Sequence, residues 1–404
     1  RGRVWSYRGT IPMTPTTPPP KLLAIVSSSR ADLAHLIHPL RALTKSARIE
    51  PVVLATGAVL QSEYGTSAER FHREGFRVRP VPCDLRIEKG VDAARAIGRA
   101  TIAFAEAFEE LQPDLVMVVA DRFEMLAPAN AALAMRIPIV HVEGGERSEG
   151  AIDDAVRNAL TKMSHLHLVT TKQAERRLLA MGEEPWRVHR VGAASLDHLQ
   201  GREIPDRDAL SAELGFDREL PMILAAIHPV TLAEDPCHDA ERLLEALART
   251  PDGDKTILFA FPNADEGSVV IRTAVSKFVS RRRNAFMHTN LAPETWLGLL
   301  HRCEGVVGNS SSVLMESPSI PTPAVCIGDR QAGRERAENV LDAAPEVDAI
   351  LDALERAQRL DLSDVTNPYG DGQASKRICT VLEQAPAREI LLRKSTTLQD
   401  QPEV

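Results

Sequence analysis

The chain has 404 residues, of which 44% are hydrophobic, 26% charged and only 4% aromatic, and its formal net charge is −8. This length exceeds one ordinary hydrophobic core, so two domains are expected. The few aromatic residues and the acidic balance exclude a base-stacking platform for nucleic acid and a general attraction to anionic membranes. The sequence also lacks an apolar run of the ~18 residues that a membrane helix needs. We therefore predict a protein with no nucleic-acid or membrane partner.

The five cysteines are scattered along the chain and show no CxxC or metal-ligand spacing. Reduced structural thiols in a cytoplasm are expected, with no metal site. Residues 1–20 are rich in Arg, Thr and Pro and lack periodicity, so we expect a disordered leader there.

Short apolar runs alternate with helical patterns through the first half of the chain. Strands are expected at 22–26, 51–55, 77–82, 115–119, 137–142 and 165–169, and helices at 91–111, 123–135 and 153–163. This alternation indicates a parallel sheet covered by helices on both faces.

The same rhythm restarts after residue 200, with strands expected at 222–227, 256–261, 305–307 and 323–327. The predicted fold class is α/β, with two doubly wound Rossmann-like domains that face each other across a cleft. The predicted domains cover 21–200 and 201–385, and residues 386–404 are expected to form a flexible tail.

Polar residues follow the predicted strands at the points where the strands end. Arg30, Asp121 and Glu143 do so in the first half, and His228, Asn263 and Ser310 in the second. Ligands of such sheets bind beyond the carboxyl ends of the strands. The pattern therefore predicts a binding site between the two halves.

The run Gly308-Asn309-Ser310-Ser311-Ser312 has the composition of an anion-binding loop at the start of a helix. Its hydroxyls can donate to phosphate oxygens, and the carboxylate of Glu316 would suit two ribose hydroxyls. A serine N-cap followed by a surface glutamate is the alternative. Arg30, His228 and Arg330 likewise have structural alternatives, as surface or packed residues.

Carboxylates gather in the first half, at Asp121, Glu143, Glu146 and Asp153. Crowded carboxylates raise one another's pKa, which can leave both an acid and a base at neutral pH. Arg122 and Lys162 are candidate counter-ions, and Asp153 could instead cap a helix.

Together these runs resemble the UDP-N-acetylglucosamine 2-epimerase family, specifically its hydrolysing branch of sialic-acid pathways. The resemblance extends in order from about residue 22 to residue 385. The motifs that carry it are 118–124, 141–146, 150–162, 227–231, 261–263, 308–316, 327–331, 337–340 and 367–372.

The resemblance implies a GT-B-like fold, no metal or redox cofactor, and a homodimer or homotetramer. The implied reaction converts UDP-N-acetylglucosamine and water to N-acetylmannosamine and UDP, by elimination of UDP and hydration of the resulting glycal. Asp121, Glu143 and Asp153 match the catalytic carboxylates, with the C2 base unassigned. The implied substrate contacts are Arg30, Arg122, His228, Asn263, Gly308, Ser310, Ser311, Glu316 and Arg330.

Three departures from the family pattern lie in these motifs. Asn158 replaces a histidine, Ala120 replaces a glycine, and Val313 replaces the last glycine of the serine-rich loop. Such changes permit a modified sugar, so the alternative prediction is the same chemistry on a UDP-diacetamido-trideoxyhexose or on a sugar nucleotide of secondary metabolism. A GT-B glycosyltransferase and a silent nucleotide-sugar sensor are further alternatives.

Overall fold

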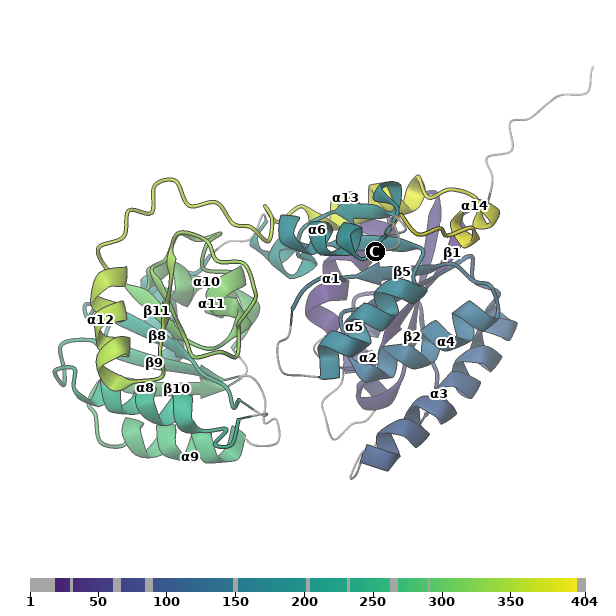
Figure 1. The fold of residues 1–404 in the computed structure, drawn as a ribbon. Helices are drawn as coiled ribbons and strands as arrows, with labels where there is room; N and C mark the ends of the chain where they lie inside the picture. The colour runs from purple at the N-terminus through teal and green to yellow at the C-terminus, as the bar shows by residue number, and fades with distance from the viewer. Residues whose placement is uncertain are drawn as a thin grey trace, which may run out of the picture.

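A computed structural model describes residues 19–29, 32–60, 67–83, 90–147, 152–200, 204–230, 233–261, 268–289 and 291–397. Within these residues the chain forms two sheets, each flanked by helices (Figure 1). The predicted leader falls almost entirely outside the described residues. No helix of the described residues combines the length and apolarity that crossing a membrane requires.

Seven parallel strands form the first sheet, in the order β3-β2-β1-β4-β5-β6-β7. Their strongly apolar sequences suit strands that are buried on both faces of a parallel sheet. The strands are β1 (Lys21–Ser27), β2 (Ile49–Ala55), β3 (Val78–Pro80), β4 (Leu115–Val119), β5 (Ile139–Val142), β6 (Leu166–Val169) and β7 (Val188–Arg190).

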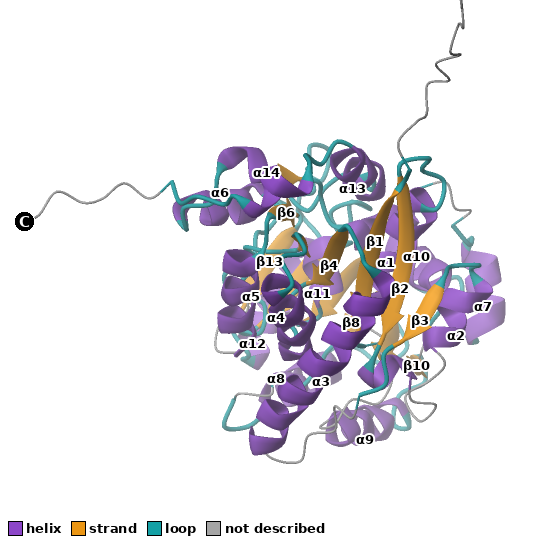
Figure 2. Ribbon diagram, turned by 90° about the vertical axis from the view of Figure 1, so that its right-hand side faces the viewer, coloured by secondary structure: helices purple, strands orange, loops and turns teal. Residues whose placement is uncertain are grey.

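Helices cover both faces of this sheet (Figure 2). Alternate side chains of β1 point to opposite faces, so Leu23 and Ile25 belong to one core and Ala24 and Val26 to the other. The first core includes α1 (Asp32–Leu43) and α2 (Ser67–Arg73), and the second includes α3 (Gly90–Leu111), α4 (Leu126–Ala134) and α5 (Ile152–Met163). Helix α6 (Lys172–Ala180) packs beside β6 and β7.

Six parallel strands form the second sheet, in the order β10-β9-β8-β11-β12-β13. These are β8 (Met222–Ala226), β9 (Thr256–Phe261), β10 (Ala285–Thr289), β11 (Gly305–Gly308), β12 (Ala324–Ile327) and β13 (Val340–Ala343). One face carries α8 (His238–Ala248), α9 (Ser268–Val279) and α12 (Val347–Ala357); the other carries α7 (Arg207–Leu214), α10 (Pro293–Arg302) and α11 (Ser311–Met315).

The winding direction reverses in each sheet next to its first strand. In the first sheet the reversal lies between β1 and β4, and in the second between β8 and β11. Ligands of doubly wound sheets bind at this switch point, beyond the carboxyl ends of the strands. The topology therefore confirms the predicted fold class and directs attention to the loops after these four strands.

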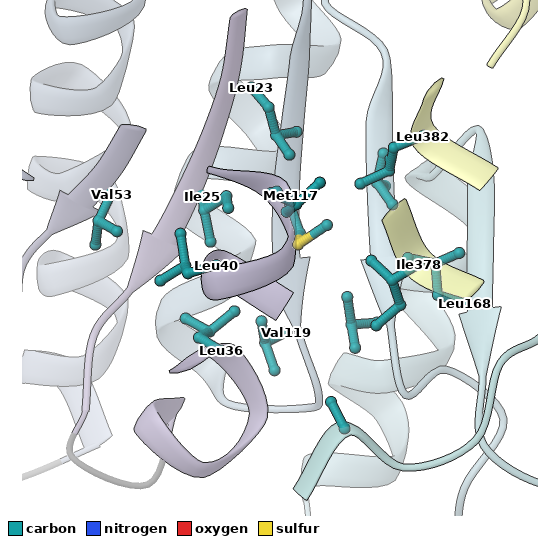
Figure 3. Packing of buried hydrophobic residues seen from close by; sticks show 14 of the residues in the cluster. Leu23, Ile25, Leu36, Leu40, Val53, Met117, Val119, Leu168, Ile378 and Leu382 are labelled. Atoms are coloured by element: carbon teal, nitrogen blue, oxygen red, sulfur yellow. The ribbon is translucent and has the colours of Figure 1, made fainter. Parts of the chain in front are cut away.

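The last two helices return to the first half of the molecule. Ile378 and Leu382 of α13 (Ala374–Glu383) pack in the same core as Leu23 and Met117 (Figure 3). Leu391 of α14 (Arg388–Leu392) belongs to this core as well. The sequence analysis placed residues 374–385 in the second half and a flexible tail from 386, and the structure differs at both places. The apolar face of α13 completes the cover of the first sheet, which explains the return.

Candidate active site

Asn309 joins the two strands at the switch point of the second sheet. Its side-chain oxygen accepts a hydrogen bond from the backbone N–H of His228 at 2.7 Å, and its amide donates to the carbonyl of His228 at 2.9 Å. Gly308, just before it, has φ +146°, and a Cβ there would lie 1.9 Å from the carbonyl oxygen of Ala226. Only glycine allows the two strand ends to approach this closely.

Arg330 and Gln331, which follow β12, reach the same point. Each donates to the backbone carbonyl of Asn309 at 3.0 Å. Burial and the charge of Arg330 together lower the pKa of His228 to about 4, so His228 is neutral at neutral pH. The predicted contacts His228, Gly308, Ser310 and Arg330 therefore lie around one buried asparagine.

The serine-rich run differs in detail from the expected cradle of backbone N–H groups. The N–H groups of Asn309 and Ser310 both donate to the carbonyl of Ala226, at 3.1 and 3.2 Å. Ser310 is the N-cap of α11, and its side chain accepts from the N–H of Ser312 at 3.4 Å. Ser310 is therefore a helix N-cap, as the structural alternative proposed, and Ser311 is the first residue of the helix.

Glu316 lies at the C-cap of α11, because this helix is only five residues long. The indole N–H of Trp296 donates to one of its carboxylate oxygens at 2.6 Å, and Nε2 of His198 is 3.5 Å from the other. His198 belongs to the segment that connects the two sheets, so Glu316 lies beside that segment.

In the first half, Asp121 forms an ion pair with Arg157 of α5, whose side chain is 4% exposed. Asp153, at the start of the same helix, has a raised pKa because of burial and the neighbouring charge of Asp121. Arg122 pairs with Glu124 at 2.6 Å, and its charge also opposes the rise in the pKa of Asp153. Asp121, Asp153 and Arg157 therefore form one charged cluster after β4.

His141 fixes the end of β5 to the end of β4. Burial lowers its pKa to about 3, so the neutral ring donates from Nε2 to the carbonyl of Ala120 at 2.8 Å. Ala120 and Glu143 both have left-handed backbones, with φ of +57° and +63°. Non-glycine residues in this region are strained, and such strain is found frequently at functional sites.

Glu143 is paired with His35 of α1, with Nδ1 2.8 Å from Oε1. Burial alone would raise the pKa of Glu143, but His35, Arg157 and Arg334 outweigh it and lower the pKa. For Glu146, the effects that raise the pKa outweigh those that lower it. Burial raises its pKa, the charge of Glu143 adds to the rise, and the hydrogen bond from Thr170 opposes it only in part.

Loops of the two halves meet beside these carboxylates. Arg177 of α6 donates to the carbonyl of Gly145 at 2.7 Å and to that of Gly333 at 3.1 Å. The N–H of Gln173 donates to Glu335 at 2.7 Å. Arg334, between the two second-half residues, lowers the pKa of Glu143 and opposes the rise at Glu146. Arg334 of the second half thus favours the ionised form of two carboxylates in the first half.

Two of the predicted site residues, Arg30 and Asn263, lie outside the described residues. His35, Asn309 and Arg334 emerge as site residues that the sequence analysis did not select. Asn309 stood inside a selected motif, and its position after a predicted strand could have indicated it. His35 gave only a weak signal, one turn into the helix after the first strand. Lys162, a predicted counter-ion, instead pairs with Glu183 at 2.7 Å.

The sequence model of the UDP-N-acetylglucosamine 2-epimerases matches residues 41–383. This chain belongs to the UDP-N-acetylglucosamine 2-epimerase family.

Three relatives in the family are named for different sugars. The chain is 33% identical to a hydrolysing UDP-N,N'-diacetylbacillosamine 2-epimerase of Legionella pneumophila, over 91% of this chain and 97% of that protein. It is 32% identical to a hydrolysing GDP/UDP-N,N'-diacetylbacillosamine 2-epimerase of Campylobacter jejuni, over 80% and 84%. Identity to a UDP-N-acetylglucosamine 2-epimerase of Neisseria meningitidis is 29%, over 87% and 91%.

Solved structures of family members share the fold. A UDP-GlcNAc 2-epimerase of Methanocaldococcus jannaschii, in complex with UDP-GlcNAc and UDP, superposes with a TM-score of 0.72 at 18% identity, covering 89% of this chain and 99% of that one. A UDP-GlcNAc 2-epimerase of Neisseria meningitidis bound to UDP-GlcNAc gives 0.66 at 19% identity, covering 90% and 99%. The two-domain, GT-B-like architecture is therefore that of the family.

The three departures from the family pattern have distinct surroundings in this epimerase-family chain. Ala120 occupies a positive-φ position, which explains why glycine is usual there. Asn158 lies on the exposed side of α5, whereas its neighbour Arg157 points inward to Asp121. Val313 lies inside α11 and is fully buried in the core, so it contributes packing and needs no unusual backbone.

Proposed function

We propose that this protein is a hydrolysing 2-epimerase that acts on a UDP-diacetamido-trideoxyhexose such as UDP-N,N'-diacetylbacillosamine. Elimination would remove UDP from C1 and the proton from C2. Water would then add at C1 while C2 is reprotonated on the opposite face. The products would be UDP and the free sugar inverted at C2.

One observation carries the reaction type: the carboxylates Glu143 and Glu146 of the first half lie beside Arg334 of the second half. Glu143 has a lowered pKa, while Asp153 and Glu146 have raised ones. Carboxyl groups whose pKa values are pushed apart suit separate roles as base and acid. Elimination needs the base at C2, and hydration needs the acid.

The second half would hold the UDP. Its switch point gathers Arg330, neutral His228 and the hydroxyls of Ser310 and Ser311, which suit a diphosphate. Two family members of the same fold have structures with UDP-GlcNAc bound. We propose His228, Arg330, Ser310, Ser311 and Gly308 as the diphosphate side of the site, and Glu316 as the ribose contact.

The choice of sugar follows from the relatives. Higher identity to the two diacetylbacillosamine 2-epimerases than to the Neisseria meningitidis enzyme supports the modified sugar over UDP-N-acetylglucosamine, which the sequence analysis had preferred. UDP-N-acetylglucosamine stays the second candidate, because the family model itself carries that description.

A competition assay tests the sugar. Equal concentrations of UDP-N,N'-diacetylbacillosamine and UDP-N-acetylglucosamine are supplied together, and the free sugars are quantified by mass. We expect the diacetamido sugar to dominate by at least about tenfold, which corresponds to roughly 1.4 kcal/mol between the two transition states. Preferential release of N-acetylmannosamine would overturn the substrate proposal and leave the reaction type intact.

A further inference from the structure

The contact between His35 and Glu143 joins two elements that are far apart in sequence. His35 lies on α1 and Glu143 follows β5, 108 positions later. Their side chains are 23% and 11% exposed, and Nδ1 is 2.8 Å from Oε1. The pair is thus well shielded from water and has the geometry of a charge-assisted hydrogen bond.

Both partners are held rigidly. Asp32, at the start of α1, accepts hydrogen bonds from the N–H groups of Ser28 and Ser29 at 2.7 and 2.9 Å. Leu36, next to His35, packs in the core below the helix (Figure 3). The N–H of Glu143 donates to the carbonyl of Leu168 at 2.9 Å, which fixes its left-handed backbone. The contact is therefore a preorganised one.

Charges from several elements favour the ionised form of both partners. Burial alone would lower the pKa of His35, but Glu143 raises it, with help from Asp32 on the same helix and Asp121 after β4. Arg157 of α5 and Arg334 after β12 join His35 in lowering the pKa of Glu143. Glu143 in turn raises the pKa of Glu146 on the same loop. These charges favour an imidazolium beside a carboxylate.

We infer that His35 is a positioning residue of the reaction, holding Oε1 of Glu143 so that Oε2 takes the C2 proton of the sugar. The inference rests on the proposed function. In the elimination step the proton moves from C2 to Oε2, the electrons of the C–H bond form the C1–C2 double bond, and UDP leaves with the electrons of the C1–O bond. His35 keeps its own proton throughout and acts through Glu143.

Two substitutions separate the charge of His35 from its hydrogen bond. His35→Leu removes both, and His35→Asn places a neutral donor near the position of Nδ1. We expect kcat to fall about 100-fold in His35→Leu, the size of loss that a displacement of ~1 Å causes in a reacting group. Both variants should move the acidic limb of the kcat/KM profile to higher pH, because Glu143 loses its cation.

His35→Asn should recover most of kcat at high pH while keeping the shifted limb, and UDP affinity should be unchanged in both variants. His72→Asn, on the exposed last turn of α2, is the control and should behave as the wild type. An unaltered acidic limb and an unaltered kcat in His35→Leu would overturn the inference. So would an equal fall of kcat in both variants with no shift of the limb, since that is the signature of a merely structural role.

A second measurement separates this inference from the proposed function. Imidazole resonances of the wild type and of Glu143→Gln are followed by NMR against pH, with no substrate present. The pKa of His35 should fall in Glu143→Gln, and an unchanged pKa would refute the pairing. If the wild type turns over no nucleotide sugar, the proposed function fails, and this titration alone decides whether the pair exists.

Discussion

Glu143 differs from the other carboxylates of the site in the charges around it. A histidine contacts it directly, and two arginines add to the effect, so it stays ionised although it is buried. Asp153 is influenced first by burial and next by the negative charge of Asp121. Under the proposed function, this contrast suits Glu143 to the role of the base and Asp153 or Glu146 to that of the acid.

Replacement of the base should stop the chemistry without disturbing the nucleotide. We expect Glu143→Gln to lower kcat at least about 100-fold, the lower end of what a general base contributes. UDP affinity, measured by calorimetry, should stay within about twofold because the diphosphate contacts lie in the other half. Glu175→Gln, on α6, is the control. Full turnover in Glu143→Gln would remove this residue from the chemistry.

Replacement of the proposed diphosphate contacts should instead reduce the affinity for UDP. His228→Ala and Arg330→Ala should each weaken UDP binding by roughly ten- to hundredfold, since a hydrogen bond to a charged group is worth about 1.5–3 kcal/mol. Arg356→Ala, exposed on α12, is the matched control for Arg330. Undiminished UDP affinity in both site variants would show that the diphosphate binds elsewhere.

At the scale of elements, a buried ion cluster fastens the C-terminal segment to the first sheet. Glu183 has no exposed side-chain surface and accepts from Lys162 at 2.7 Å, from His167 at 2.9 Å and from Lys394 at 2.6 Å. Arg187, also fully buried, donates to the carbonyls of Leu391 and Arg393. These bonds hold residues 388–395 beside β6 and β7.

This cluster should make the fold sensitive to acid. Its partners lower the pKa of Glu183 to about 2, from an unfolded value near 4.5. A lowered pKa stabilises the fold above the unfolded value, and that stabilisation is lost as pH falls toward 2. We therefore expect the free energy of unfolding, measured with urea, to decrease steadily below about pH 4.5.

Glu183→Gln should cost roughly 3–5 kcal/mol at pH 7, because it leaves buried cations without their partner, and it should flatten the acid dependence. The exposed variant Glu389→Gln should change neither property. Equal slopes against pH in the wild type and Glu183→Gln would contradict the assignment.

Sequence patterns predicted the central strands of both sheets and the edge strand β3, but missed the other three edge strands. Buried strands such as β4 and β9 are continuous apolar runs, and helix α3 begins within one residue of its expected start. Strands β7, β10 and β13 were not predicted, because each is short or partly exposed and mixes polar with apolar residues.

Only the site residues that closely follow a strand could be predicted from the sequence. Asp121, Glu143, His228 and Ser310 follow strands, and the structure places them at or beside the switch points of their sheets. The partners that set their charge come from distant segments, as His35 and Arg334 do for Glu143. No local sequence pattern indicates such pairs. The packing of α13 against the first sheet could not be predicted for the same reason, because it also joins segments that are far apart in the chain.

At the scale of the whole molecule, Arg177 connects the two halves at the site, since it donates hydrogen bonds to carbonyls on both sides. Arg177→Met should weaken this contact, raise the radius of gyration of the unliganded protein in small-angle scattering, and leave the circular dichroism spectrum unchanged. The intact UDP-sugar should reverse the expansion, because its UDP would contact the second half and its sugar the first. Arg176→Met, on the exposed side of the same helix, is the control, and identical scattering from both variants would refute the tie.

The central claim is that carboxylates of the first half act at C2 of a sugar whose UDP is held by the second. Turnover of UDP-N,N'-diacetylbacillosamine in D2O, followed by NMR of the released sugar, tests this most directly. The account predicts UDP together with a C2-inverted sugar that carries one deuterium at C2. Release of UDP with the C2 hydrogen retained would contradict it.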